Sequence, residues 1–217
     1  MRIWILAALL ATGCVSQSKY VKVKEENDRL HARIDRMEKR ADAQLAQLRE
    51  LIADLKPLID RKVLEVEVVE GRVTIGMASD VLFASGSAEL SAAGKESIGE
   101  LTRLLKRRAA DHDFQVEGHT DNEDIHTEKF PNNWHLGAAR SIAVVEYMIA
   151  QGFPEDHVSA ATFSDTKPVE PNSSASGRAL NRRIEVVVLP DLSDLPGYEK
   201  LTKERPARAR SRKHKKS

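Results

Sequence analysis

One arginine in this sequence lies where an apolar side chain would be expected. Arg140 falls one helical turn after Leu136 and one turn before Val144, on the apolar face of a predicted helix. A guanidinium buried there without an anionic partner is unfavourable by several kcal/mol. The residues therefore predict either an internal ion pair that fixes the helix or a receptor for an anionic ligand, and they favour neither.

A second group of side chains carries the atoms that metal ions bind. The group lies within residues 112–126 and consists of His112, Asp113, His119, Asp121, Glu123, Asp124 and His126. It lacks a recognised ligand spacing such as His-Glu-x-x-His, and the segment is typical of a strand followed by a polar loop. The single cysteine, Cys14, excludes a multi-thiolate zinc site and an intramolecular disulfide. We therefore predict no metal site and no cofactor.

No nucleophile stands in a recognised catalytic setting. The sequence has no Gly-x-Ser-x-Gly motif, and Ser85 lies between Ala84 and Gly86 in a predicted loop. We therefore do not predict a serine hydrolase.

The composition fits one folded domain with appendages. The chain has 217 residues, of which 41% are hydrophobic and 31% are charged, so it is not wholly disordered. Residues 203–217 hold eight of the 34 basic residues but one of the 33 acidic residues. This leaves 26 basic and 32 acidic residues, a net charge of −6, in residues 1–202. An acidic body argues against a nucleic-acid partner, and we expect residues 191–217 to be a basic, disordered tail.

The N-terminal residues have the pattern of an export signal. Met1 and Arg2 precede an uncharged, mostly apolar stretch that ends at Thr12 and is too short to cross a bilayer. Residues 10–14 resemble a bacterial lipobox, although Ala11 stands where leucine is usual. We expect residues 1–13 to be a lipoprotein signal peptide and Cys14 to be lipidated, with a plain signal peptide as the alternative.

A heptad pattern of mostly apolar residues runs from residue 20 to residue 58 and predicts a helical stalk over residues 14–62. Its core positions are Tyr20, Val23, Asn27, Leu30, Ile34, Met37, Ala41, Gln44, Leu48, Leu51, Leu55 and Leu58. The pattern favours a coiled-coil homodimer, or a single amphipathic helix folded back onto the following domain. Pro57 is predicted to kink or end the helix.

Residues 63–190 alternate between strand and helix patterns. We expect a hairpin over 64–77, strands at 81–83, 114–117, 159–163 and 183–189, a helix capped by Ser91, and a second helix that starts after Asn133 and stops at Gly152. This order predicts an α+β fold, a two-layer α/β sandwich with a mixed sheet.

Four segments of this region resemble a known family in both sequence and order. Residues 82–90, 118–122, 133–140 and 177–185 are similar to the OmpA-like C-terminal domain, the peptidoglycan-binding module shared by OmpA, the Pal lipoprotein and the stator protein MotB. The resemblance implies a domain that holds the cell wall without covalent chemistry.

The resemblance also implies which residues bind. Asp121 and Arg140 correspond to the family's pair that clamps meso-diaminopimelate, an amino acid with an ammonium and a carboxylate on one stereocentre. We expect Thr120 to orient the loop of Asp121. Asn133 is expected to cap the following helix or to contact the ligand, and Arg182 to line the site or to pair with a carboxylate.

This sequence departs from the family pattern at several positions. Gly137 replaces the usual serine, which predicts a looser helix start, and Phe163-Ser164-Asp165 replaces a Gly-x-Gly loop. The inserted residues 130–134 resemble the MotB-type branch. A stator subunit also needs a spanning helix with an ionisable residue, and residues 3–13 supply neither.

Together these patterns predict a lipid-anchored protein on the periplasmic side of the outer membrane that binds peptidoglycan. The expected partners are the stem peptide, the membrane and a second copy of the chain. The alternatives are a MotB-type wall anchor and a metal-dependent peptidoglycan hydrolase.

Overall fold

The computed structural model describes residues 16–69, 71–190 and 198, and the chain forms two compact units that meet between Arg49 and Glu50. The elements are α1 (Gln17–Asp60), β1 (Glu65–Val69), β2 (Arg72–Ala78), α2 (Ser79–Leu82), α3 (Ala92–Arg108), β3 (Phe114–His119), α4 (Asn133–Ala150), the short 3-10 helix η1 (Glu155–His157), β4 (Val158–Ser164), α5 (Ala175–Asn181) and β5 (Arg183–Val188). The predicted signal peptide, Cys14 and all of the predicted tail except Tyr198 lie outside the described residues.

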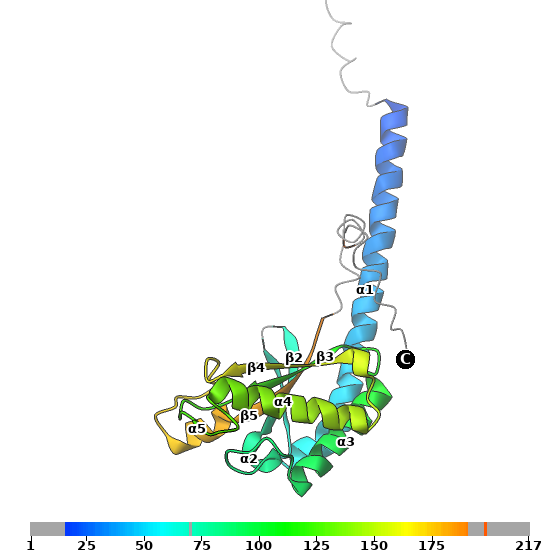
Figure 1. The fold of residues 1–217 in the computed structure, drawn as a ribbon. Coiled ribbons are helices and arrows are strands. Elements are labelled where there is room, and N and C mark those ends of the chain that lie inside the picture. Colours follow the sequence, from blue (N-terminus) through cyan, green and yellow to red (C-terminus); the bar gives the residue numbers. More distant parts are fainter. Residues whose placement is uncertain (1–15, 70, 191–197, 199–217) are drawn as a thin grey trace, which may run out of the picture. The chain divides into compact units, whose positions relative to one another are not determined.

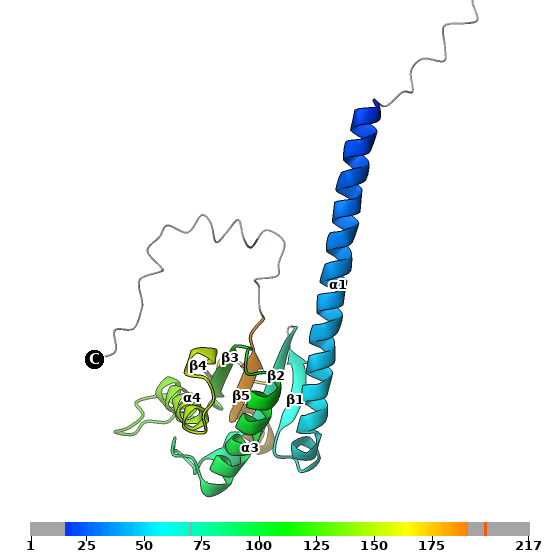
Figure 2. The ribbon, with the colours of Figure 1, turned by 90° about the vertical axis from the view of Figure 1, so that its right-hand side faces the viewer.

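The second unit is built on a five-stranded mixed sheet with the order β1-β2-β5-β3-β4. β3 and β4 are parallel, whereas the other neighbours are antiparallel. Helices α3 and α4 pack together on one face of this sheet (Figures 1 and 2). The predicted two-layer sandwich with a mixed sheet is confirmed.

Alternation along the strands separates the two faces of the sheet. Ile75, Val116 and Val186 are paired in register and are fully buried on the helix-covered face. The residues between them, which include Glu117 and Glu185, therefore point to the opposite face. This second face carries charged side chains, although Glu117 is also buried.

Helix α4 approaches the sheet so closely that two glycines meet. A Cβ on Gly118 would lie 2.1 Å from the carbonyl oxygen of Gly137, and a Cβ on Gly137 would lie 2.3 Å from Oγ1 of Thr162. The prediction that Gly137 loosens the helix start is wrong, because α4 runs unbroken from Asn133 and the missing side chain lets the helix contact the sheet.

The last turns of α1 belong to the second unit. Leu51, Leu55 and Leu58 are buried, and Asp54 forms ion pairs with Arg107 and Arg108 of α3, at 2.9 and 2.7 Å. The segment from residue 50 thus packs onto the domain, as the folded-back alternative predicts for this part of the seam. The helix ends at Asp60, within one turn of Pro57.

Residues 16–49 form the described part of the first unit, and nearly all of their described side chains are exposed. None of the helices within the described ranges is both long and apolar enough to cross a membrane.

Two local predictions differ from the structure. Residues 79–82 form one turn of helix, α2, where a strand was expected, and Phe83 pairs with Leu90 in an isolated bridge. Helix α5 is not predicted from the sequence; its N-cap Ser174 accepts a hydrogen bond from the backbone of Gly177 at 3.0 Å.

Candidate functional site

The loop that follows β3 holds Asp121 in a fixed position. The Thr120 amide donates to the carbonyl of Ser164 at 2.9 Å, and the Thr120 hydroxyl donates to the carbonyl of Asp121 at 2.9 Å. The Asp121 carboxylate accepts the amide of Glu123 through Oδ1 at 3.2 Å. Asp121 is 5% exposed, so this carboxylate is held nearly out of solvent.

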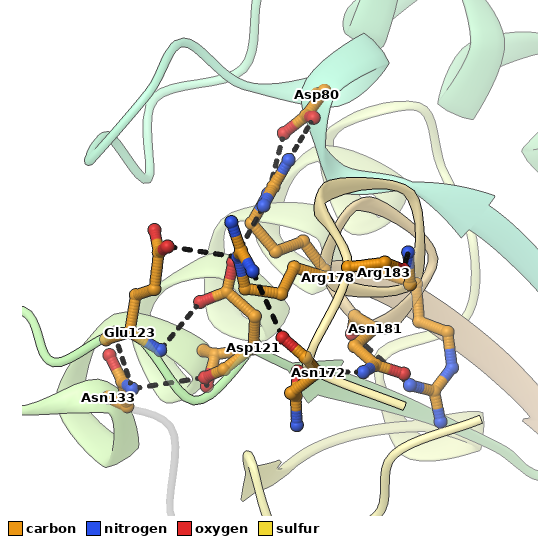
Figure 3. Close-up of polar contacts among 12 residues, drawn as sticks. Asp80, Asp121, Glu123, Asn133, Asn172, Arg178, Asn181 and Arg183 are labelled. Carbon is orange, nitrogen blue, oxygen red and sulfur yellow. Dashed lines mark hydrogen bonds and ion pairs between the residues drawn. The ribbon is translucent and has the colours of Figure 1, made fainter. Parts of the chain in front are cut away.

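Asn133 fixes the same loop from the first residue of α4. Its side-chain amide donates to the carbonyls of Asp121 at 3.2 Å and Glu123 at 3.0 Å (Figure 3). The expectation that Asn133 caps the helix is wrong, since Asn132 is the N-cap and accepts the amide of His135 at 3.2 Å. Asn132 caps the helix, and the side chain of Asn133 instead holds the Asp121 loop.

Arg182, directly before β5, joins two carboxylates. Its Nη1 lies 2.6 Å from Oδ2 of Asp121, while Nη2 and Nε donate to the two oxygens of Asp80 at 2.7 and 3.2 Å. These bonds raise the pKa of the Arg182 guanidinium, and the same contact lowers the pKa of Asp80. Asp80 was not predicted; as one acid among 33, it carries no sequence signal that singles it out.

Arg140 lies close to this cluster but is bound differently. Its Nε donates to the carbonyl of Ser87 at 2.8 Å, and its guanidinium carbon lies 5.1 Å from the centroid of the Phe83 ring. Burial lowers the pKa of this guanidinium; Asp80 and Asp121 oppose the shift, and Arg182 adds to it. Arg140 and the Asp121 carboxylate therefore share one electrostatic environment.

The terminal nitrogens of Arg140 are available. Arg140 is 3% exposed, yet none of the described carboxylates lies within ion-pair distance of it. Neither Nη1 nor Nη2 has a hydrogen-bond partner among the described residues, and neither is enclosed from solvent. The internal ion pair predicted as one alternative is thus not formed within the described ranges.

A third arginine borders the site on α5. Nε of Arg178 lies 2.9 Å from Oε1 of Glu123, and its Nη1 donates to the carbonyl of Asn172 at 3.0 Å (Figure 3). Asn181 binds Asn172 Oδ1 and the backbone of Glu170. These contacts attach the loop before α5 to the Asp121 loop.

These elements thus bring an anion-binding group, the Arg140 guanidinium, and the Asp121 carboxylate into one region of the domain. Arg140 offers two N–H groups in the planar geometry that matches a carboxylate, and Asp121 offers oxygens to a cation. The predicted Thr120, Asp121, Asn133, Arg140 and Arg182 all lie in this one region. Sequence reasoning missed Asp80, Ser87 and Glu123, which hold these residues in place.

Comparisons with known proteins identify the family of this domain. The OmpA family matches residues 82–182, a range that contains the first three motifs and residues 177–182 of the fourth. Motility protein B of Bacillus subtilis is 31% identical over 128 residues, which cover 58% of this chain and 49% of that protein. The peptidoglycan-binding protein ArfA of Mycobacterium tuberculosis is 31% identical over 108 residues, which cover 50% of this chain and 32% of that protein. The chain thus spans at most about half the length of these curated relatives.

The fold has solved counterparts. The cell wall anchor of the T6SS from Pseudomonas aeruginosa superposes with a TM-score of 0.60 at 33% identity, over 65% of this chain and 97% of that one. The family match, the order of the motifs and the shared fold lead to one conclusion: residues 82–182 are an OmpA-like domain, and the chain belongs to the OmpA family.

Proposed function

We propose that this chain binds peptidoglycan without covalent chemistry, by holding the zwitterionic end of diaminopimelate between Arg140 and Asp121. The observation that carries the proposal is the buried Arg140, whose two terminal NH₂ groups, at Nη1 and Nη2, lack a partner in the described structure. A ligand carboxylate would satisfy both groups at once in bidentate geometry.

Asp121 is the proposed acceptor for the ligand's ammonium. Its Oδ2 is bonded to Arg182, whereas its Oδ1 accepts a single longer bond from the amide of Glu123. An ionised carboxylate has about four acceptor sites, so Oδ1 can take an ammonium while Arg182 stays in place. Arg182, Thr120 and Asn133 act as positioning residues in this proposal.

The expected affinity of one site is modest. Charge-assisted hydrogen bonds contribute about 1.5–3 kcal/mol each, and binding also orders the ligand. A cell wall presents many copies of the same stem peptide, so more than one domain on a common wall would gain strength by avidity.

The test compares two synthetic stem peptides that differ in one residue. We expect a peptide with meso-diaminopimelate to bind the full chain in calorimetry, and the same peptide with L-lysine not to bind, because lysine lacks the side-chain carboxylate. Arg140→Ala and Asp121→Ala should remove binding and cosedimentation with sacculi. Arg61→Ala, which removes an ion pair with Glu100 elsewhere in the domain, should leave both intact. Equal binding of the two peptides would contradict the proposal.

We further propose that Cys14 carries the lipid that holds the protein at the periplasmic face of the outer membrane. The support is the resemblance of residues 10–14 to a lipobox. Radiolabelled palmitate should enter the wild-type chain and not Cys14→Ser, and the variant should leave the membrane fraction. Fractionation of the labelled chain with inner membranes would contradict the outer-membrane assignment.

A homodimer through the first unit completes the proposal. Tyr20, Val23, Leu30, Ile34 and Met37 follow the heptad seam, and each side chain is at least 42% exposed. An exposed apolar seam of this kind is buried when two helices coil together. Sedimentation equilibrium should give a dimer for the wild type and a monomer for Leu30→Glu/Ile34→Glu; a wild-type monomer would contradict the proposal.

A further inference from the structure

Three ionisable side chains gather on the sheet face opposite to helices α3 and α4. Glu117 and His119 project from β3, and Glu185 projects from the neighbouring strand β5. His119 Nε2 lies 3.6 Å from Oε2 of Glu117 and 3.7 Å from Oε2 of Glu185. One candidate ligand atom from each residue lies within 4.8 Å of the other two.

The imidazole of His119 is buried without hydrogen bonds. The residue is 3% exposed, and both ring nitrogens are enclosed with no partner among the described residues. One ring face stacks on Phe163, with centroids 5.5 Å apart. Buried polar atoms in native proteins nearly always have partners, so a partner is expected for Nε2. The two carboxylates beside it are just beyond hydrogen-bond range.

The separations fit a metal ion. With zinc–ligand distances of about 2.0–2.2 Å, donor atoms at a tetrahedral site lie roughly 3.4 Å apart. The two observed separations from Nε2 exceed this value by a few tenths of an ångström. Small side-chain rotations, without movement of the strands, would bring the three ligand atoms to binding distance of one ion.

An arginine lies beside each carboxylate; the one beside Glu185 is hydrogen-bonded to it, whereas the one beside Glu117 lies beyond hydrogen-bond range. Oε1 of Glu185 is bonded to Nε of Arg183 at 2.5 Å, and Oε1 of Glu117 lies 3.6 Å from Nη1 of Arg72. Each carboxylate thus directs one oxygen to an arginine and the other to His119. Metal-binding carboxylates in proteins commonly have such outer partners, which hold their orientation.

A cavity of about 620 Å³ opens beside the three residues and is lined by all of them. Its wall also includes the acidic Glu67 and Glu170 and the basic Lys62 and Lys167. The cavity leaves room for water or a small ligand at a fourth coordination position, as at open zinc sites. Imidazole with two carboxylates suits zinc and related transition metals rather than calcium, which takes oxygen ligands.

We propose that Glu117, His119 and Glu185 bind one divalent transition-metal ion, represented by Zn²⁺. The site lies on the sheet face away from Arg140 and does not depend on the proposed wall binding. It revises the sequence-based expectation of no metal, because the ligands come from two strands 66 residues apart and form no local spacing motif.

The test is a Zn²⁺ titration of the metal-free full chain by calorimetry, with Co²⁺ absorption as a second readout. We expect His119→Gln and Glu185→Gln each to weaken the tightest site by about tenfold or more and to remove the tetrahedral Co²⁺ bands. His157→Gln is the matched control, since His157 is partly exposed and lies 2.7 Å from Asp113. This variant should keep the tight site and the Co²⁺ bands.

Two results would overturn the proposal. One is a wild-type protein that takes up no more Zn²⁺ than His119→Gln; the other is a tight site that His157→Gln removes. Circular dichroism of the metal-free variants checks that they fold. If neither folds, the imidazole ¹⁵N resonances of His119 in the wild type decide, since one equivalent of Zn²⁺ must shift Nε2; unchanged resonances would mean that no Zn²⁺ binds at His119 and would also overturn the proposal.

Discussion

Arg182 and Arg140 lie in the same site, yet their surroundings differ in kind. Arg182 uses three of its nitrogens on the carboxylates of Asp80 and Asp121, and these raise its pKa. Arg140 is more deeply buried, bonds a single backbone carbonyl, and has its pKa lowered by burial. We call the Arg182 guanidinium saturated, because each of its three nitrogens bonds a protein oxygen, and the Arg140 guanidinium unsaturated, because only its Nε does so among the described residues.

The difference supports the proposal that Arg182 belongs to the fold and that Arg140 binds a ligand. A saturated guanidinium contributes to stability, because its removal leaves a buried carboxylate unpaired. An unsaturated guanidinium that is buried destabilises the free protein, and a bound anion would remove this destabilisation. The proposed ligand-binding arginine is therefore distinguished by the hydrogen-bond partners it lacks, not by the number of contacts it makes.

The largest expected effect follows from removal of the unsaturated arginine. Arg140→Met should lower affinity for the diaminopimelate peptide by about 100-fold or more, since two charge-assisted bonds of about 1.5–3 kcal/mol each disappear. Its free energy of unfolding should stay within about 1 kcal/mol of the wild type, because the lost hydrogen bond is offset by the removal of a buried charge. Calorimetry and urea unfolding of the same preparation measure both quantities.

Arg140→Lys sharpens this result. Lysine keeps the charge but cannot offer two parallel N–H groups to one carboxylate, so binding should remain well below that of the wild type. Full binding by the lysine variant would show that charge alone, rather than bidentate geometry, holds the ligand.

Removal of the saturated arginine should have the opposite profile. Arg182→Met leaves the Asp121 carboxylate without its cation, and the Asp121 side chain is only 8% exposed. We therefore expect a loss of about 2–3 kcal/mol in the free energy of unfolding. The affected measurement is the urea midpoint. Adding Asp121→Asn should recover part of the loss, because no buried charge then remains unpaired. A loss no greater than that of Arg140→Met would erase the distinction between the two arginines.

The saturated cluster also predicts acid sensitivity. Arg182 lowers the pKa of Asp80 below its ordinary value of 3.8, so the folded state holds this proton less tightly than the unfolded chain. The stabilisation is therefore present above about pH 4 and is lost as the pH falls through the lowered pKa. Asp80→Asn should flatten this part of the stability profile between pH 4 and 2, measured by thermal unfolding. An unchanged slope would mean that Asp80 is equally acidic in both states.

Much of this arrangement could be predicted from the sequence. Strand alternation gave the hairpin and β5, and Ser91 gave the start of α3, because these signals are local. Arg140 stood out because a charge interrupted an apolar helical face. The family motifs then placed Asp121 and Arg182 beside it.

The remainder depends on contacts between distant segments. Asp80 and Arg182 are 102 residues apart, and the Ser87 carbonyl that holds Arg140 is a backbone group with no sequence signature. Residues 81–83 are apolar enough for a strand, yet residues 79–82 form a helical turn. The Phe83 amide closes this turn on the Ser79 carbonyl, and the Ser79 amide attaches it to the Arg182 carbonyl. Neither the partner of Arg182 nor the end of the first unit at Arg49 could be read from local patterns.

The smallest effect is expected at the third arginine. Arg178 pairs with Glu123, whose side chain is 66% exposed, and exposed pairs of this kind contribute about 0.2–1 kcal/mol. Arg178→Met should therefore lower the free energy of unfolding by less than about 1 kcal/mol and change peptide affinity by less than about threefold. If its affinity instead falls as far as that of Arg140→Met, the ligand reaches α5 and contacts an arginine that the free protein already pairs. The number of hydrogen-bond partners in the free protein would then no longer distinguish arginines that bind ligand from those that stabilise the fold. The contrast between Arg140 and Arg182 would reflect depth of burial alone.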